Sequence, residues 1–512
     1  MHIFGATILL GLALTRAVLA ANSDAWRGRT IYQVFTDRFA RTDGSTTAQC
    51  DTAASDYCGG TWLGIINRLD YIQDLGFDAI WISPVTHQVE GTSIDGSAYH
   101  GYWQDDIDSV NEHFGTADDL RALAAELHSR GMLLMVDIVV NHLAWIGAPD
   151  TVDYSTFPQF KSPDYFHPYC QNNYLAENVT NIEQCWMGST NVPLPDLRTE
   201  DSEVQNIWNA WISGLISDYS IDALRIDSVM EVNTDFWASF QAAAGVYSLG
   251  EVYMESSDFV ASYQNYLPGV FNYAYYFPLR RAFAEGGTIA ALAEAIDIIK
   301  AGAYRDTSLL GTFSENHDQP RIGALTPDYA LAKNVIAGTM LTDGIPVIYQ
   351  GQELHYQAYG GQNTPFNREA IWLSGYPTDG ELYAATKKFN AARKNAAADD
   401  PTYLTYQNYH FYTDDDVIAM RKGKMVTLLT QQGSGGSNYT LNIASGYDGG
   451  TQVTELLTCS RLTASSDGTL AVPMTAGQPR VYYPTADIGS QCGSPSKRSP
   501  RRSMKWRTNQ WE

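Results

Sequence analysis

The sequence predicts an α/β protein built on a closed (β/α)8 TIM barrel, with an irregular subdomain inserted after the third strand and a C-terminal antiparallel β-sandwich domain. Short apolar segments alternate with longer amphipathic ones from about residue 30 to residue 400, and the alternation repeats about eight times. Strand–helix alternation is typical of a parallel sheet, and eight repeats favour closure into a barrel.

The predicted barrel strands are short apolar runs bounded by polar or turn residues. They cover Ile31–Phe35, Ala79–Ser83, Leu133–Val140, Ala223–Ile226, Tyr247–Gly250, Leu309–Phe313 and Pro346–Tyr349. Between the second and third of them, Asp118–Arg130 carries leucine and alanine at helical spacing and ends before Gly131, which predicts one of the intervening helices.

Two regions break this rhythm and divide the barrel sequence. Residues 142–198 are rich in Asn, Pro, Tyr and Gly and show no convincing helix, so we interpret them as an inserted subdomain between barrel segments 21–141 and 199–401. Residues 402–492 alternate in segments such as Val417–Met420 and Met425–Leu429 with Gly, Ser and Asn turns. This pattern predicts a separate antiparallel β domain.

Both ends of the chain have a composition of their own. Residues 1–20 contain an apolar stretch followed by small residues, which is typical of a secretory signal peptide, and we therefore expect an extracellular protein. No later segment has 18 uninterrupted apolar residues, so no transmembrane helix is predicted. Residues 493–512 are basic and are expected to be a disordered tail.

The composition narrows the class of partner. A formal net charge of −24 argues against nucleic acid and anionic membranes, whereas neutral polysaccharide is compatible with it. The chain holds 32 Tyr and 12 Trp, whose flat apolar faces can stack on sugar rings but can also form core. Nothing in the sequence indicates oligomerisation, so a monomer is expected.

The cysteines and sequons agree with secretion. All six cysteines lie beyond the signal peptide, and their proximity suggests the pairs Cys50–Cys58, Cys170–Cys185 and Cys459–Cys492, although six cysteines allow about fifteen connectivities. Asn178 and Asn438 each begin a glycosylation sequon, a tripeptide that also occurs by chance.

Three acidic motifs suggest the chemistry. Asp227 ends Asp-Ala-Leu-Arg-Ile-Asp, Glu251 lies in Leu-Gly-Glu-Val, and Asp318 ends Glu-Asn-His-Asp, each after a short apolar run that we interpret as a strand. Barrel enzymes assemble catalytic groups from the ends of different strands. Each acid alone could be an ordinary strand-end residue. Three together suit glycoside hydrolysis, in which one acid protonates a leaving oxygen and another attacks the sugar carbon.

These motifs also carry a family resemblance. Together with the stretches Thr36–Gly44, Ala98–Trp103, Val136–His142 and Gly344–Glu353, they occur in the order found in secreted fungal members of the α-amylase glycoside hydrolase family (family 13), and the chain resembles them from about Trp26 to Cys492. The resemblance implies hydrolysis of α-1,4-glucosidic bonds in starch, glycogen and malto-oligosaccharides, with retention through a covalent glycosyl-aspartate.

The resemblance also implies a role for each acid. Asp227 corresponds to the nucleophile, Glu251 to the general acid/base, and Asp318 to the residue that holds sugar hydroxyls and stabilises the transition state. Arg225 precedes Asp227 by two residues, so it is expected on the same strand face, where it can keep the nucleophile ionised. A structural salt bridge is its alternative role.

Further residues are implied as sugar ligands and as ligands of Ca²⁺. The implied sugar-binding residues are His100, Tyr102, Trp103, His142, Arg225, Met230, Glu231, His317 and Arg368. The implied calcium ligands are the side chains of Asn141 and Asp196 and the backbone carbonyls of Glu183 and Glu231, an all-oxygen set that suits a hard cation.

The chain departs from the family beside the nucleophile. Met230 and Glu231 stand where secreted fungal members commonly have Lys-His, which contacts the sugar on the leaving-group side. Altered acceptor binding leaves open a 4-α-glucanotransferase that uses the same three acids. The barrel fold alone would also permit a second alternative, a non-catalytic carbohydrate-binding protein. The intact acids argue against the latter.

Overall fold

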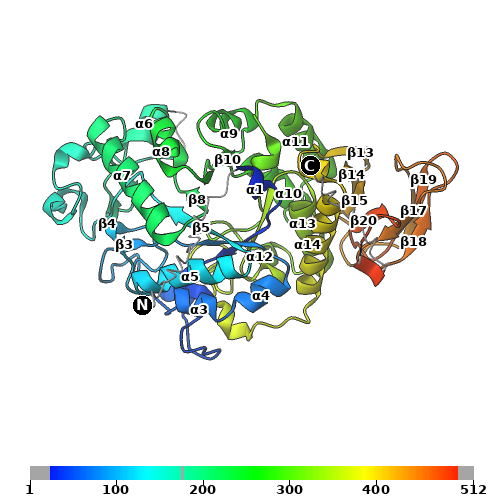
Figure 1. Cartoon of the computed structure of the whole chain (residues 1–512), viewed down its shortest axis with the longest axis horizontal. Coiled ribbons are helices and arrows are strands. Elements are labelled where there is room, and N and C mark those ends of the chain that lie inside the picture. Colours follow the sequence, from blue (N-terminus) through cyan, green and yellow to red (C-terminus); the bar gives the residue numbers. More distant parts are fainter. Residues whose placement is uncertain (1–22, 175–177, 490, 494–512) are drawn as a thin grey trace, which may run out of the picture.

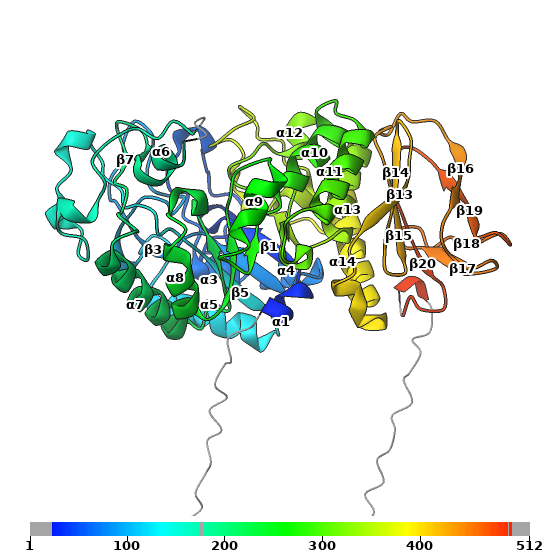
Figure 2. The ribbon, with the colours of Figure 1, turned by 90° about the horizontal axis from the view of Figure 1, so that it is seen from above.

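The computed structural model describes residues 23–174, 178–489 and 491–493. The predicted signal peptide at 1–20 and residues 494–512 of the predicted tail lie outside the described residues. The barrel occupies the centre of the molecule, with the inserted segment and the C-terminal domain at opposite ends of it (Figures 1 and 2).

Eight parallel strands form the barrel sheet in the order β10-β9-β8-β5-β2-β1-β12-β11. Their bounds are β1 Ile31–Val34, β2 Ala79–Ile82, β5 Leu133–Ile138, β8 Ala223–Ile226, β9 Tyr247–Gly250, β10 Gly269–Val270, β11 Gly311–Thr312 and β12 Ile345–Tyr349. The two ends of this order meet, because Phe271 bridges Gly311 and the amide of Asn272 donates to the carbonyl of Gly311 at 2.9 Å. The predicted barrel is therefore confirmed.

Alternation along the strands separates two cores. In β2, Ala79 and Trp81 point into the barrel, whereas Ile80 and Ile82 pack outward against the helices. Because side chains alternate in this way, residues two apart share a face. In β8 this rule places Arg225 on the inner face, in line with Ala223.

Helices surround the sheet. The longer ones are α5 Ala117–Ser129, α7 Ser202–Tyr219, α8 Phe236–Ala244, α10 Tyr273–Ala284, α11 Ile289–Ala301, α13 Tyr329–Leu341 and α14 Glu381–Asp399. The shorter ones are α1 Ser23–Arg27, α2 Thr36–Phe39, α3 Trp62–Ile66, α4 Leu69–Asp74, α9 Ser257–Tyr263 and α12 Ile322–Leu325. The helix predicted at 118–130 is α5, which begins with a capping box between Thr116 and Asp119.

Some predicted strands differ in length from those observed. The strand predicted at 133–140 ends at Ile138, and the one predicted at 309–313 is reduced to β11 because residues 307–309 form a 3-10 turn. Strand β10 was not predicted, since two residues give no periodic signal.

The inserted segment holds more regular structure than its sequence predicts. It contains α6 Val179–Gln184 and a two-stranded sheet of β6 Met187–Gly188 and β7 Pro193–Leu194. Asn178 begins α6 with a side chain that accepts hydrogen bonds from the amides of Thr180 and Asn181, a short helix signal that the periodicity did not reveal. Next to it, β3 Thr86–Gln88 and β4 Gln104–Val110 form an antiparallel pair outside the barrel.

The C-terminal domain is a sandwich of two antiparallel sheets, as predicted. The six-stranded sheet has the order β13-β14-β15-β20-β17-β18, and β16 pairs with β19 in the other. The strands are β13 Tyr409–Thr413, β14 Val417–Lys422, β15 Met425–Thr430, β16 Tyr439–Ala444, β17 Gln452–Glu455, β18 Arg461–Thr463, β19 Thr469–Met474 and β20 Arg480–Pro484. Val426 and Leu428 from one sheet share a core with Ile443 and Val472 from the other.

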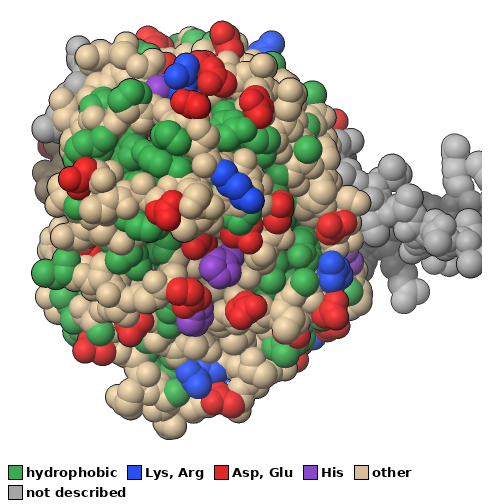
Figure 3. All heavy atoms as spheres, turned by 90° about the vertical axis from the view of Figure 1, so that its left-hand side faces the viewer, with side chains coloured by type: hydrophobic (Ala, Val, Ile, Leu, Met, Phe, Trp, Pro, Cys, Tyr) green, Lys and Arg blue, Asp and Glu red, His purple; other side chains and the backbone are tan. Residues whose placement is uncertain are grey.

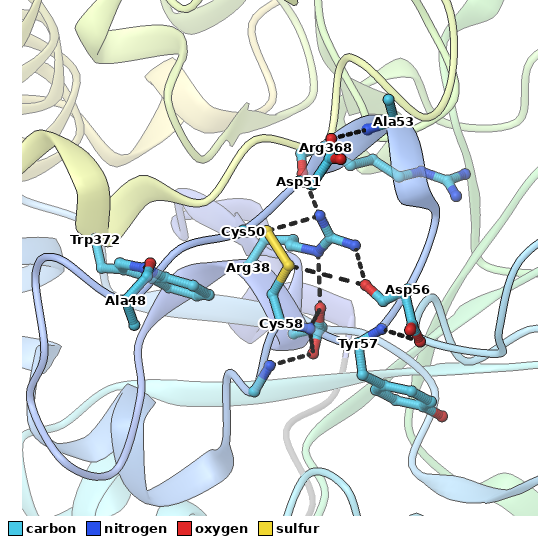
Figure 4. The surroundings of a disulfide bond; sticks show 12 residues. Arg38, Ala48, Cys50, Asp51, Ala53, Asp56, Tyr57, Cys58, Arg368 and Trp372 are labelled. Carbon is cyan, nitrogen blue, oxygen red and sulfur yellow. Dashed lines mark hydrogen bonds and ion pairs between the residues drawn. A yellow bond between two sulfur atoms is a disulfide. The ribbon is translucent and has the colours of Figure 1, made fainter.

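The structure forms the three disulfides that proximity suggested, Cys50–Cys58, Cys170–Cys185 and Cys459–Cys492. Figure 4 shows the first of them beside the buried Arg38, which donates to Cys50 Sγ at 3.0 Å and to the carbonyl of Asp56 at 2.7 Å. Arg38 also donates to the carbonyl of Arg368, so it links the crosslinked loop to the backbone of a predicted sugar ligand.

The described surface agrees with the acidic composition. On the face shown in Figure 3, acidic side chains are spread among neutral ones with fewer basic side chains between them. Among the described residues, no helix combines the length and the apolar character that crossing a bilayer requires.

Candidate active site

A cavity of about 390 Å³ opens at the carboxyl ends of the barrel strands. It is lined by His100, Tyr102, Trp103, His142, Met187, Leu194, Asp227, Ser228, Glu251, Tyr253, Asp318, Gln319 and Arg368. The three predicted catalytic acids therefore share one cavity, although they lie up to 91 residues apart in sequence. Asp227 follows β8, Glu251 follows β9, and Asp318 follows β11 after a short loop.

Arg225 holds two of these acids from below. Its side chain is 1% exposed, its Nη1 lies 2.7 Å from Asp227 Oδ1, and its Nη2 lies 2.7 Å from Glu251 Oε2. Nη1 also contacts Asp137 Oδ1 at 3.0 Å. One buried cation thus faces three carboxylates, which fixes the positions of the two acids on the cavity wall.

The carboxyl of Glu251 has a raised pKa. Burial raises its pKa to about 8, against the opposing effect of Arg225, and the nearby Asp227 raises it further. The Tyr273 hydroxyl donates to Glu251 Oε1 at 3.4 Å. Glu251 is therefore protonated at neutral pH, the state that a general acid requires.

Ser228 contacts both acids. Its backbone is left-handed, with φ of 51°, and its hydroxyl donates to Asp227 Oδ2 at 2.5 Å. Its amide N–H donates to Glu251 Oε2 at 3.3 Å. With Arg225 on Oδ1 and Ser228 on Oδ2, both oxygens of Asp227 accept hydrogen bonds, and these bonds fix the orientation of the carboxylate.

Asp318 is the most exposed of the three acids. Its side chain is 35% exposed, and Arg368 Nη2 donates to Asp318 Oδ1 at 2.9 Å. His317 Nε2 lies 3.0 Å from the other oxygen of Asp318. Arg368 Nε also donates to the carbonyl of His317, so one guanidinium holds both neighbouring residues of the motif.

The predicted histidines lie in or directly under the cavity wall. His100 and His142 line it, while His317 is buried beneath it and is 1% exposed. Burial lowers the pKa of all three, and nearby Arg368 lowers the pKa of His100 and His317 further. Neutral imidazoles can both donate to and accept from sugar hydroxyls.

The predicted aromatic residues line one side of the cavity. The ring of Tyr102 is stacked on that of His317 at 5.3 Å between centroids, and its hydroxyl donates to Asp137 Oδ2 at 2.8 Å. Trp103 packs edge-on against His100 at 4.7 Å. The position of Tyr102 is therefore fixed by both stacking and a hydrogen bond.

Oxygens suited to a hard cation lie at the junction of barrel and insertion. Asn141 Oδ1 and Asp196 Oδ1 are both buried without a hydrogen-bond partner among the described residues. The two residues are neighbours, since Asp196 bridges His142 and the amide of Leu197 donates to the carbonyl of Asn141. The other oxygen of Asp196 accepts from His167 at 2.7 Å. Unpaired buried oxygens are costly, and a cation would satisfy them.

The backbone ligands implied for the same site come from adjacent elements. Glu183 lies in the last turn of α6, whose final carbonyls lack partners within the helix, and Glu231 ends the 3-10 turn Val229–Glu231 that packs against α6. No group of three or more His, Cys, Asp or Glu side chains in the described chain is arranged to hold a metal, so a site here would combine the Asp196 carboxylate with amide and peptide oxygens. The residues fit a calcium ion.

The comparisons with known proteins identify the family of the chain. Residues 33–402 match the family model for the alpha amylase catalytic domain, and residues 410–500 match the model for alpha-amylase domain C. This chain belongs to the alpha-amylase family. It is a glycoside hydrolase, and the family supports the predicted hydrolysis of α-1,4-glucosidic bonds in starch. The two alternative functions, glucan transfer and non-catalytic carbohydrate binding, are not favoured.

Individual relatives match almost the whole chain. Alpha-amylase 2 of Schwanniomyces occidentalis is 49% identical over 472 residues, which cover 91% of this chain and 92% of that protein. Alpha-amylase 1 of Lipomyces kononenkoae is 50% identical, over 94% of this chain and 77% of that protein. The solved structure of an alpha-amylase from Malbranchea cinnamomea superposes with a TM-score of 0.89 at 48% identity, covering 92% of this chain and 100% of that one.

Two predicted sugar ligands lie away from the cavity surface. Met230 is 6% exposed and belongs to the apolar core, and Glu231 is 7% exposed; neither is among the residues that line the cavity. Burial raises the pKa of Glu231 well above its usual value, and the charges of Glu251 and Asp227 raise it further.

The sequence interpretation missed several residues at the site. Met187, Leu194, Ser228, Tyr253 and Gln319 line the cavity but were not predicted. Ser228 and Gln319 directly follow predicted catalytic acids, and Tyr253 follows Glu251 by two residues, so their positions carried a usable signal. Met187 and Leu194 come from the inserted segment, whose folding onto the cavity no local pattern predicts.

Proposed function

We propose that this chain is a retaining endo-α-amylase in which Asp227 is the nucleophile, Glu251 the general acid/base and Asp318 the transition-state stabiliser. The observation that carries this proposal is the pair of contacts from Arg225, at 2.7 Å to both Asp227 and Glu251, under a cavity of about 390 Å³. Retaining hydrolysis needs one ionised and one protonated carboxyl close together.

The two acids act in sequence. Glu251 donates its proton to the leaving glucosidic oxygen while Asp227 attacks the anomeric carbon, so that the bond to the leaving sugar breaks as an ester to Asp227 forms. The ionised Glu251 then removes a proton from water, whose oxygen attacks the same carbon and releases Asp227. The raised pKa of Glu251 near 8 supports its role as the initial acid.

The remaining cavity residues bind the glucan. Asp318, held by Arg368, offers an exposed carboxylate to sugar hydroxyls, and His100, His142 and the deeper His317 supply neutral donors and acceptors. Tyr102 offers an aromatic face to a glucose ring, and Trp103 extends that wall. Met230 and Glu231 are proposed to tune the side of the site that holds the leaving sugar.

Calcium is proposed to bind Asn141 and Asp196 through side chains and Glu183 and Glu231 through backbone carbonyls. The unpaired buried oxygens of Asn141 and Asp196 support the proposal. When bound, the ion joins the barrel to the insertion that supplies Met187 and Leu194 to the cavity wall. A strong chelator should lower the melting temperature of metal-loaded protein, because a ligand at 100 times its Kd adds about 2.7 kcal/mol to stability. Identical melting curves with and without the chelator would contradict the site.

The domain division and cellular context are also proposals. We propose a barrel of residues 21–141 and 199–401, an inserted subdomain at 142–198 and a β domain at 402–492. The protein is proposed to be a secreted monomer, and the three disulfides support an oxidising compartment. At both sequons, the asparagine Oδ1 accepts backbone hydrogen bonds, which leaves the amide nitrogen as the atom for a glycan.

Product analysis with maltoheptaose tests the activity. We expect only shorter malto-oligosaccharides, released first in the α configuration, and no turnover by the control Asp227→Asn. Products longer than the substrate would instead show transfer to a sugar, and products released first in the β configuration would contradict retention.

A further inference from the structure

A buried glutamine lies behind the cavity on strand β1. Gln33 is 2% exposed and lies on the inner face of the barrel with Ile31, and it pairs with Trp81 of β2 and Tyr349 of β12. Its Nε2 lies 2.8 Å from His317 Nδ1, while its Oε1 is buried and lacks a partner among the described residues. An unpaired amide oxygen in the interior lowers the stability of the fold. We therefore asked what the contact between Gln33 Nε2 and His317 contributes to the site.

The proton of His317 is located by the groups around Nε2. Asp318 Oδ2 lies 3.0 Å from Nε2, and the Tyr102 oxygen lies 2.6 Å from it. A lone pair on Nε2 would face the carboxylate of Asp318, so Nε2 must carry the hydrogen. The Tyr102 hydroxyl accepts from Nε2–H, and its own hydrogen donates to Asp137 Oδ2 at 2.8 Å.

The opposite nitrogen must then accept a hydrogen bond. His317 is buried, and Arg368 and Arg225 lower its pKa against the weaker opposing effect of Asp227, so the ring is neutral and Nδ1 has a lone pair. Gln33 is the donor that meets it. The reversed amide orientation would direct Oε1 at that lone pair and is excluded.

We propose that Gln33 is a positioning residue of the active site: its side-chain amide donates to His317 Nδ1 and fixes the ring proton on Nε2, towards Tyr102 and Asp318. A directed chain of hydrogen bonds follows, from Gln33 through His317 and Tyr102 to Asp137, which also accepts from Arg225 beneath the nucleophile. The chain connects β1 to the acids that follow β8 and β11.

The test compares two substitutions of Gln33 with the same substitutions of a second buried glutamine. Gln33→Glu keeps the size but can only accept, and Gln33→Met keeps the approximate volume without a donor. Gln350 provides the matched control, because it is buried directly after the neighbouring strand β12 and its side chain accepts from the amide of Phe35, with no hydrogen bond to His317. Full-length proteins labelled with ¹⁵N-histidine report the proton on each ring nitrogen by NMR, and His317→Gln identifies the resonances.

In the wild type, we expect His317 with a bare Nδ1 and a protonated Nε2. Gln33→Glu should place a proton on Nδ1. Gln33→Met should shift the Nδ1 resonance, because its hydrogen bond is lost, while Nε2 stays protonated opposite Asp318. Gln350→Glu and Gln350→Met should leave the His317 resonances as in the wild type. A wild-type proton on Nδ1, or an unchanged ring in Gln33→Glu, would overturn the proposal.

The kinetic consequence rests on the proposed function, whereas the NMR result does not. Gln33→Glu should lower kcat on maltoheptaose about tenfold or more with a smaller change in KM, because misplacing one buried donor at a reacting centre typically costs about that much or more. Gln33→Met should show a smaller fall. A displaced proton in Gln33→Glu with wild-type kcat would show that the tautomer is set as proposed but does not serve the reaction.

Discussion

Two buried arginines in the barrel make similar ion clusters, and two of the acids around Arg225 line the cavity. Arg225 contacts Asp137, Asp227 and Glu251, and Arg321 contacts Glu315 and Glu369. Both side chains are at most 1% exposed, and burial raises the pKa of Glu251 to about 8 and that of Glu315 to about 7. A buried charge with a shifted pKa does not by itself identify an active site.

The partners of the acids distinguish the two clusters. The cluster around Arg321 has a structural role. Glu315 Oε1 accepts from the amide of Ile322 at the start of α12, and Arg321 donates to the carbonyl of Gln350. Asp227 and Glu251 instead line an open cavity. The comparison predicts that substitutions around Arg225 change turnover, whereas substitutions around Arg321 change stability.

The largest effect is expected for Asp227→Asn. The amide cannot form the glycosyl ester, so kcat on starch should fall at least about 10⁴-fold, as for other nucleophile substitutions. The nearly equal volume should leave the melting temperature close to that of the wild type. Wild-type kcat in this variant would show that another residue attacks.

Glu251→Gln should separate protonation from attack. Turnover of starch should fall by about 10²–10⁴-fold, the usual contribution of a general acid, while substrates with very good leaving groups keep some turnover. Equal losses on both kinds of substrate would argue against an acid role for Glu251.

The pH dependence of the wild type follows from the same residue. Glu251 is protonated below its pKa of about 8, so kcat/KM should hold through neutral pH and fall as pH rises through about 8. Measured on substrates with very good leaving groups, this alkaline decline should be weaker, since they need no proton. A decline centred near pH 5 would contradict the assigned acid.

Arg321→Met should affect stability alone. Removing one partner of a buried ion pair costs about 3–5 kcal/mol, so the melting temperature should drop clearly, measured by calorimetry. The kcat per folded molecule should stay near the wild-type value. A loss of kcat without a loss of stability would contradict the assignment of a structural role to the Arg321 cluster.

Ser228→Ala should have the smallest effect of the series. It removes the hydroxyl that donates to Asp227 and keeps the amide that donates to Glu251. A hydrogen bond to a charged group contributes about 1.5–3 kcal/mol, so kcat should fall by roughly one to two powers of ten, and Ser228→Thr should recover part of it. Activity equal to the wild type would show that Arg225 alone positions the nucleophile.

The sequence predicted the barrel and the three acids because both depend on local patterns. The alternation of strands and helices is visible in the hydrophobic pattern of the sequence. Each of the three acids, Asp227, Glu251 and Asp318, follows a short apolar strand directly or within a few residues. Asp137 lay in a recognised motif, yet its place under Tyr102 and Arg225 depends on the pairing of β5 with β8. Gln33 lies 284 residues from His317 in sequence, and the folding of the barrel brings them together.

The contribution of the insertion was least predictable. Met187 and Leu194 reach the cavity because β6 and β7 fold back over the barrel, and two-residue strands give no periodic signal. Met230 and Glu231 lie close to the nucleophile in sequence, but the 3-10 turn that follows Ser228 leaves them largely buried and outside the residues that line the cavity.

Trapping the covalent intermediate tests the central assignment most directly. A 5-fluoro glycosyl fluoride of a malto-oligosaccharide forms the intermediate quickly and releases it slowly, because fluorine destabilises the oxocarbenium-like transition state and fluoride is a good leaving group. Digestion and mass spectrometry of the treated protein should find one added glycosyl group, on the peptide that contains Asp227, and none in Asp227→Asn. An adduct on Glu251 or Asp318, or turnover of the reagent with inversion and no adduct, would contradict the account.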